Sequence, residues 1–216
     1  MIKGGRNIFI IALIITIVLF SLGFLLGNYI AGSMIKKFQT EEEKLFFSLI
    51  ALDVKQEMVE NVCEIKDYDL WKEKEELGTM LTDLEQKLGK DNEEVLAKKE
   101  LYEIVEIKTL LLLNKMKSEC NKDFNMILFF YTNEKNVNGQ QSESEGHVLD
   151  TIVHEYNEEK DDKRVYIFTF SMETKNSASL ALKTKYNITE FPSLVVNENL
   201  LIGFQQRDVI LDFIKE

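Results

Sequence analysis

Two cysteines are the residues of this chain best suited to redox chemistry or covalent cross-linking. Cys63 and Cys120 are the only thiols in 216 residues. They lie far apart in sequence, so they lack the Cys-x-x-Cys arrangement that lowers the pKa of a thiol. Three uses of the pair remain open: a structural disulfide, two buried free thiols, or a redox pair that works with a partner oxidoreductase. Two cysteines and two distant histidines form no zinc ligand cluster, so we predict no metal and no cofactor.

A second group of reactive side chains lies in and just after the polar stretch of residues 132–145. Ser142 or Ser144, with His147 or His154 as the base, would supply the groups of a hydrolase. Nothing around them resembles a nucleophile elbow, and no glycine-rich phosphate loop is present. The two histidines are seven residues apart, on one face of a predicted helix, where surface imidazoles are expected. We therefore predict no catalytic residue among them.

An apolar segment near the N-terminus is the clearest element of the sequence. Residues 8–26 contain no charge in 19 positions, and residues 28–30 continue the helix. About 20 helical residues cross the ~30 Å hydrocarbon layer of a membrane. The segment is longer than the apolar core of a cleaved signal peptide, although Ala31-Gly-Ser33 leaves cleavage as an alternative. We expect residues 1–37 to form a single-pass anchor whose span covers about residues 8–30.

The charges flanking the span predict its orientation. Lys3 and Arg6 precede it together with the amino terminus, whereas Lys36 and Lys37 follow it. The positive-inside rule then favours a cytoplasmic N-terminus, with residues 38–216 outside the cell membrane. All 37 acidic residues lie in that second part, which carries a net charge of −15. Such an acidic chain is poorly suited to nucleic-acid phosphates, so nucleic acid is not an expected partner.

Residues 38–123 have the pattern of a helical region. Leucines recur there at spacings of three, four and seven, and Gly89 is a plausible helix stop. Because the turn at Gly89 is short, the helices on either side should lie antiparallel. Cys63 and Cys120 would then meet at the open end of the hairpin, which is compatible with a disulfide if their Cα atoms lie within ~7 Å. The predicted helices cover residues 40–62, 69–88 and 91–118, with caps at Thr40, Asp69 and Asp91 or Asn92.

Residues 124–216 alternate between short apolar runs and amphipathic segments. Strands are predicted at 126–131, 164–170, 193–196 and 200–204, and helices at 146–156, 177–186 and 207–215. The order β-α-β-α-β-β-α implies parallel pairing with right-handed crossovers. The turn at residues 197–199 makes the last two strands an antiparallel hairpin. We thus predict an α/β protein with an N-terminal transmembrane helix, a helical hairpin over 38–123 and this α/β domain over 124–216.

The only proline of the chain, Pro192, stands at the entry to the third strand, a place where proline is unfavourable. The segment Tyr186-Asn-Ile-Thr-Glu-Phe-Pro-Ser-Leu-Val-Val196, the element order and Gly203 together resemble the thioredoxin-like family. The resemblance covers residues 124–216. It implies a cis bond between Phe191 and Pro192 beside the active site. It also implies that Phe191 offers its backbone to an extended peptide substrate.

The sequence departs from the family at the redox motif. The family's Cys-x-x-Cys lies between the first strand and the first helix, where this chain has residues 138–146 and no cysteine. Ser142 or Ser144 stands at one former cysteine position, and a serine hydroxyl cannot replace a thiolate in disulfide exchange. The expected function is non-catalytic: binding a peptide or partner protein, or scaffolding a membrane complex. The alternative is an oxidoreductase component in which Cys63 and Cys120 cycle with a partner enzyme.

Overall fold

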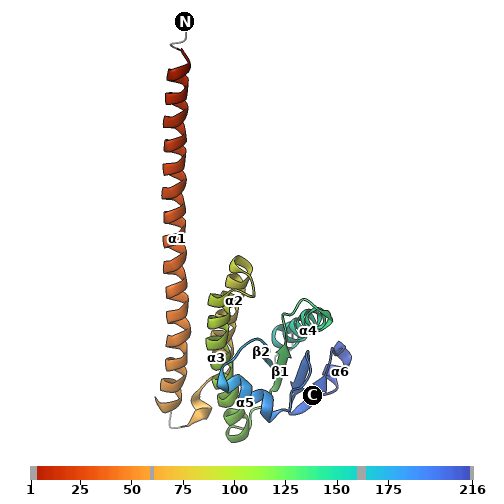
Figure 1. Ribbon diagram of the computed structural model, residues 1–216. Coiled ribbons are helices and arrows are strands. Elements are labelled where there is room, and N and C mark those ends of the chain that lie inside the picture. Colours follow the sequence, from red (N-terminus) through yellow and green to blue (C-terminus); the bar gives the residue numbers. More distant parts are fainter. Residues whose placement is uncertain (1–3, 59–60, 160–163, 215–216) are drawn as a thin grey trace. The chain divides into compact units, whose positions relative to one another are not determined.

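The chain forms a mixed α/β structure with one four-stranded sheet, which confirms the predicted class. We describe it from a computed structural model that covers residues 4–58, 61–159 and 164–214. The chain divides into two compact units, Met1–Lys44 and Leu45–Glu216. Helix α1 (Gly4–Met58) contributes to both units (Figure 1).

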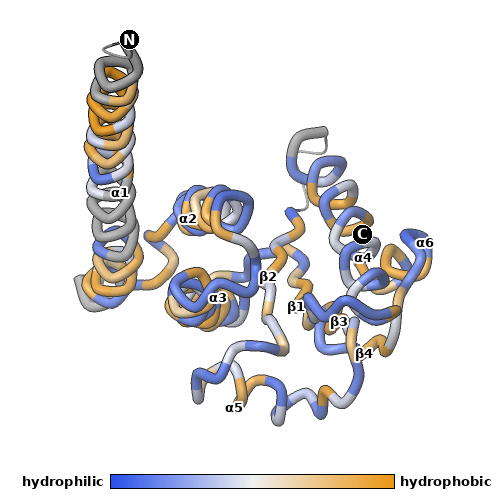
Figure 2. Tube along the Cα trace, turned by 45° about the horizontal axis from the view of Figure 1, so that its top comes forward, coloured by the Kyte–Doolittle hydropathy of each residue, from blue (hydrophilic) through white to orange (hydrophobic). Residues whose placement is uncertain are grey.

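Helix α1 contains the predicted membrane span. Its stretch Ile11–Ile30 is long and apolar enough to cross a membrane, and Figure 2 shows mostly hydrophobic colours along it. The prediction of a new helix at Thr40 is wrong, because α1 passes through that position without interruption. The glutamates that follow Thr40 are good helix formers and no glycine or proline interrupts the chain there. The predicted end near Val62 is also wrong, since α1 ends at Met58; residues 59–60 lie outside the described residues.

Helices α2 (Asp67–Leu88) and α3 (Glu93–Glu119) form the predicted hairpin. Gly89 ends α2 with a φ of 92°, a left-handed value that favours glycine, and Asn92 caps α3 through the Glu94 N–H. The cap expected at Asp69 is wrong, because α2 begins two residues earlier and Asp69 lies in its first turn. At the open end, Cys63 and Cys120 are joined in a disulfide, with Cα atoms 5.4 Å apart. Cys63 itself belongs to a short 3₁₀ helix, Val62–Glu64.

The sheet has the strand order β2-β1-β3-β4. Strands β1 and β2 are parallel, β3 is antiparallel to β1, and β4 forms an antiparallel hairpin with β3. The parallel β1–β2 pair and the final hairpin confirm two predicted pairings, but the parallel pairing implied for the third strand is wrong, because β3 runs antiparallel to β1. The closing helix α6 is shorter than predicted and ends at Leu211. The bounds are Asn125–Tyr131 for β1, Val165–Ser171 for β2, Ser193–Val196 for β3, Asn199–Ile202 for β4, Val137–His154 for α4, Glu155–Glu159 for the π-helix η2, Ser177–Lys185 for α5 and Arg207–Leu211 for α6.

The core of the second unit lies between the sheet and the helices that cover it. Leu149 and Ile152 of α4 are buried, as are nearly all residues of β1, β2 and β3. On α2, the single tryptophan Trp71 packs against Tyr166 and Phe168 of β2, with ring centroids 5.2 and 6.5 Å apart. The helical hairpin and the sheet therefore share one packed core. The boundary at residues 123/124 stays a prediction from sequence pattern.

Candidate functional site

Three segments meet at the end of the sheet where β1 finishes. Strands β1 and β2 are parallel, so their carboxyl ends lie side by side, and β3 begins beside the end of β1. In the antiparallel β1–β3 register Phe130 pairs with Ser193, so Pro192, the residue before Ser193, lies opposite Tyr131. The residue that the sequence singled out as a binding corner therefore lies beside the turn that leads from β1 into α4.

The bond between Phe191 and Pro192 is cis, as the resemblance implied. Pro192 is buried, and its carbonyl accepts a hydrogen bond from the Gly203 N–H at 2.9 Å. The Ser193 hydroxyl donates to the Glu190 carbonyl at 2.7 Å. Within the described part of the chain, the backbone of Phe191 makes no hydrogen bond. Hydrogen bonds from Gly203 and Ser193 thus hold the corner. The backbone N–H and carbonyl of Phe191 remain without a hydrogen bond in the described residues.

The stretch predicted as a redox-motif loop is the first half of helix α4. The helix was expected to open at Gly146, but it begins at Val137, so this prediction is wrong. The Asn136 side chain caps it by accepting from the Gly139 N–H at 3.0 Å. The preceding turn also requires glycine at position 139, because a Cβ there would lie 1.9 Å from the Glu134 carbonyl oxygen. The early turns lack apolar periodicity because they are mostly exposed, so the pattern did not signal a helix.

The two serines of that stretch have structural roles. Ser142 is buried and its hydroxyl oxygen accepts from the Thr132 N–H at 3.2 Å. Ser144 donates to the Gln140 carbonyl one turn earlier in its own helix, at 2.9 Å. Within the described residues neither serine hydroxyl is hydrogen-bonded to an imidazole, and His147 lies exposed on the same helix. Both hydroxyl groups are thus engaged with the backbone.

The turn between β1 and α4 is anchored by one carboxylate, Glu173. It accepts from the Thr132 hydroxyl and from the Asn133 N–H, both at 2.8 Å, and from the Ser171 hydroxyl. Burial raises the pKa of Glu173, but these donors outweigh burial and hold the pKa below its usual value. The turn is therefore fixed from the adjacent end of β2.

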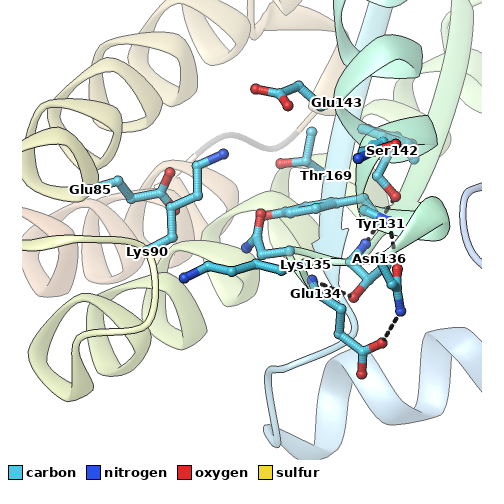
Figure 3. Close-up of a pocket in the computed structure, with 14 residues that line it drawn as sticks. Glu85, Lys90, Tyr131, Glu134, Lys135, Asn136, Ser142, Glu143 and Thr169 are labelled. Carbon is cyan, nitrogen blue, oxygen red and sulfur yellow. Dashed lines mark hydrogen bonds between the residues drawn. The ribbon is translucent and has the colours of Figure 1, made fainter.

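A cavity of about 490 Å³ opens beside this turn (Figure 3). Glu85 and Lys90 of the hairpin face Tyr131, Lys135 and the first turns of α4 across it. Two smaller cavities, of about 280 and 200 Å³, continue between α2 and the sheet and share Thr169 with it. A volume of several hundred Å³ is the size of small-ligand pockets in proteins.

Behind the cavity, charged residues of the hairpin cover the outer edge of β2. Lys74 donates to the Ile167 carbonyl at 2.5 Å, and Glu106 accepts from the Thr169 N–H at 3.0 Å. Lys74 and Glu106 form a buried ion pair of 2.9 Å. Burial raises the pKa of Glu106, and the Lys74 ammonium opposes that shift. Because an unpaired sheet edge invites strand addition, these side chains close β2 to further pairing.

Glu103 extends the same cover to the end of β2. It accepts from the Ser171 N–H at 2.7 Å, the Thr174 hydroxyl at 2.7 Å and the Ser179 hydroxyl at 2.5 Å. The Asn176 side chain is a fourth donor, at 3.1 Å. Burial raises the pKa of the Glu103 carboxyl, while these donors lower it. One glutamate of α3 therefore fixes the whole connection from β2 to α5, which leads to the Pro192 corner.

Glu145 joins α4 to the segment after β4. Its Oε2 accepts from the Gln205 N–H at 2.7 Å, and its Oε1 is buried without a hydrogen-bond partner in the described chain. Burial raises the pKa of Glu145 to about 7, against the opposing effect of the Gln205 N–H.

The structure separates the cysteines from the corner. Cys120 precedes β1 by five residues, whereas Pro192 lies beside the last residue of β1. A seven-residue strand is about 20 Å long, so the disulfide and the corner lie near opposite ends of it. The chemistry predicted for the two cysteines and the recognition predicted for Phe191 and Pro192 are not brought together.

Sequence reasoning missed the buried charges at this end of the molecule. Lys74, Glu103 and Glu106 lie in helices whose charged residues are normally expected to face water. A usable signal was present: α3 has apolar residues nearly all round, so some of its charges had to be enclosed, and Thr169 and Ser171 supply polar partners in an otherwise apolar strand.

Compared with models of protein families and with curated proteins, the chain matches none, so the proposal for its function rests on residues and geometry.

Proposed function

We propose that this chain is a membrane-anchored, thioredoxin-like binding module that holds an extended peptide segment at the Pro192 corner without thiol chemistry. The observation that carries the proposal is the backbone of Phe191, which makes no hydrogen bond in the described chain and precedes a cis proline. Extended peptides bind by pairing their main chain with such available backbone groups. The strand order and the pairing directions support the thioredoxin-like reading.

The residues at the motif position support the proposed lack of thiol chemistry at the corner. Ser142 is buried and engaged with the turn, and Ser144 is bonded within its own helix. The two cysteines are bonded to each other at the far end of β1. Among the residues that the structure describes, none at the corner favours the enzymatic alternative, in which Cys63 and Cys120 cycle with a partner oxidoreductase.

The anchored arrangement rests on α1 and on the charges around it. The stretch Ile11–Ile30 suits a span, and the basic residues flanking it favour an N-terminus in the cytoplasm. A disulfide persists in oxidising compartments outside the cytoplasm, which fits a second unit on the outer side of the cell membrane. A partner polypeptide at that surface is then the expected ligand.

The proposal is tested by selecting binders from a random peptide library with the full-length chain in lipid nanodiscs. Phe191→Pro removes the backbone N–H at the corner, so binding of the selected peptides should fall at least about tenfold, the loss of one well-placed hydrogen bond. Phe191→Leu keeps the backbone and should bind nearly as well as the parent. Equal binding by both variants, with the fold confirmed by Trp71 fluorescence, would overturn the proposed site.

Disulfide reduction by the same preparation tests the non-catalytic part. The parent should show no turnover of a protein disulfide beyond that of Cys63→Ala/Cys120→Ala. Robust turnover that disappears in the double variant would instead establish the oxidoreductase alternative.

A further inference from the structure

The cavity beside Tyr131 has polar groups that the chain itself does not satisfy. Asn133 lines it, and its side-chain Nδ2 is buried without a hydrogen-bond partner in the described residues. Its backbone N–H is already bonded to Glu173, which holds the residue in place. Leaving a buried amide donor without a hydrogen bond costs about 1–3 kcal/mol, and native proteins rarely contain such a donor. An acceptor from outside the chain is therefore expected in this cavity.

The charges around the cavity indicate the nature of that acceptor. Of its three carboxylates, Glu85 is paired with Lys99 at 2.6 Å and Glu134 accepts from the Asn136 side chain at 2.7 Å, which leaves Glu143 as the one without a partner in the described residues. Lys90 and Lys135 have no ion-pair partner in the part of the chain that is described. With the Asn133 amide, the unengaged groups are thus mainly donors and cations, and they suit an anionic acceptor.

The same lining limits the charge and shape of the ligand. Glu85, Glu134 and Glu143 all line the cavity, so a doubly charged phosphate would be repelled more strongly than a singly charged carboxylate. One wall is formed by Phe129 and Tyr131, whose rings stack with centroids 5.4 Å apart. These aromatic rings in the lining favour a ligand with an apolar body.

We propose that this cavity binds a carboxylate attached to an apolar body, with the carboxylate accepting from Asn133 and lying near the ammonium groups of Lys90 and Lys135. The chemistry has two sources: a free small carboxylate, or the carboxyl terminus of a peptide. The site is separate from the Phe191 backbone and does not depend on peptide pairing there.

The test uses the full-length chain in lipid nanodiscs and calorimetric titration with matched probes. Benzoate is compared with benzamide, and a short peptide with a free carboxyl terminus and an apolar last residue is compared with its C-terminal amide. Saturable binding of benzoate but not of benzamide assigns a small carboxylate. Binding of the free peptide alone assigns a peptide terminus. Equal binding of each pair, or binding of no probe, overturns the proposal and leaves a water-filled cavity.

Variants locate the binding within the molecule. Asn133→Asp replaces the donor amide by a carboxylate of the same shape and should weaken binding at least about tenfold. Asn138→Asp makes the same change at the second residue of α4, an exposed residue outside the lining, and should leave binding unchanged. If Asn133→Asp does not fold, Glu143→Gln is the second variant: it removes an opposing charge and should tighten carboxylate binding. Unchanged binding in both lining variants would overturn the site.

Discussion

Glu103 is the residue through which the hairpin most directly holds the end of the sheet, and its removal should be costly. Glu103→Ala deletes the acceptor of four donors: Ser171, Thr174, Asn176 and Ser179. A hydrogen bond to a charged group contributes about 1.5–3 kcal/mol, but such contributions are not additive, and water entering the cavity would satisfy some donors. We therefore expect the free energy of unfolding to fall by about 3–5 kcal/mol.

Two variants separate this effect from the general cost of changing α3. Glu103→Gln keeps the shape and one acceptor oxygen, and should cost about 1–2 kcal/mol. Glu100→Ala, on the same helix, removes a single exposed bond to the Lys175 N–H and should cost less than about 1 kcal/mol.

Denaturant unfolding of the full-length chain in detergent micelles measures these differences. The single tryptophan, Trp71, is buried against β2 and reports on the unit that contains Glu103. If Glu103→Ala costs no more than Glu100→Ala, the idea that one buried glutamate organises the connection from β2 to α5 is refuted.

Three further predictions use the same unfolding assay. The pKa of Glu145 is raised to about 7, against 4.5 in the unfolded chain, so the free energy of unfolding should fall as the pH rises from 4.5 to 7. Glu145→Gln should be up to about 3 kcal/mol more stable than the parent at pH 8 and equal to it at pH 4. A stability difference that does not vary with pH contradicts this. The double variant Cys63→Ala/Cys120→Ala opens a closed loop of 57 residues and should lose about 4 kcal/mol in the chain-entropy model, whereas a loss below 1 kcal/mol would deny the bond a stabilising role. Gly139→Ala forces a Cβ to within 1.9 Å of the Glu134 carbonyl oxygen and should lower the free energy of unfolding by about 1–3 kcal/mol. The control Gly146→Ala, whose Cβ meets only Phe129 at 4.0 Å, should be neutral or slightly stabilising. Equal effects of the two variants would show that the turn does not need Gly139.

Much of the architecture could be read from apolar patterning. The strands have short apolar runs and the hairpin has a leucine seam ended by Gly89, so their positions were predicted to within a few residues. The disulfide was one of several open uses of the cysteines, and it became the favoured one only through the antiparallel hairpin. The cis bond at Pro192 came from a family resemblance, since a lone proline by itself does not specify it.

The elements that were missed have little apolar pattern. The first half of α4 is polar, and its beginning depends on the Asn136 cap and on the space left by Gly139, neither of which periodicity reveals. Helix α1 continues through Thr40. A residue that could cap a helix N-terminus therefore does not start a new helix when the chain before it is already helical. The cavity and its unsatisfied Asn133 depend on three segments meeting in space, so no local pattern contains them.

The measurement that tests the binding proposal most directly is cross-linking from position 191 in cells that express the full chain. A photoreactive phenylalanine replaces Phe191, and the same residue at Leu180, half exposed on α5, serves as the control. We predict that position 191 gives adducts that map to one short segment of a partner polypeptide, and that position 180 gives none above background. No adduct from position 191, or equal yields from both positions, would contradict a peptide-binding corner at Pro192.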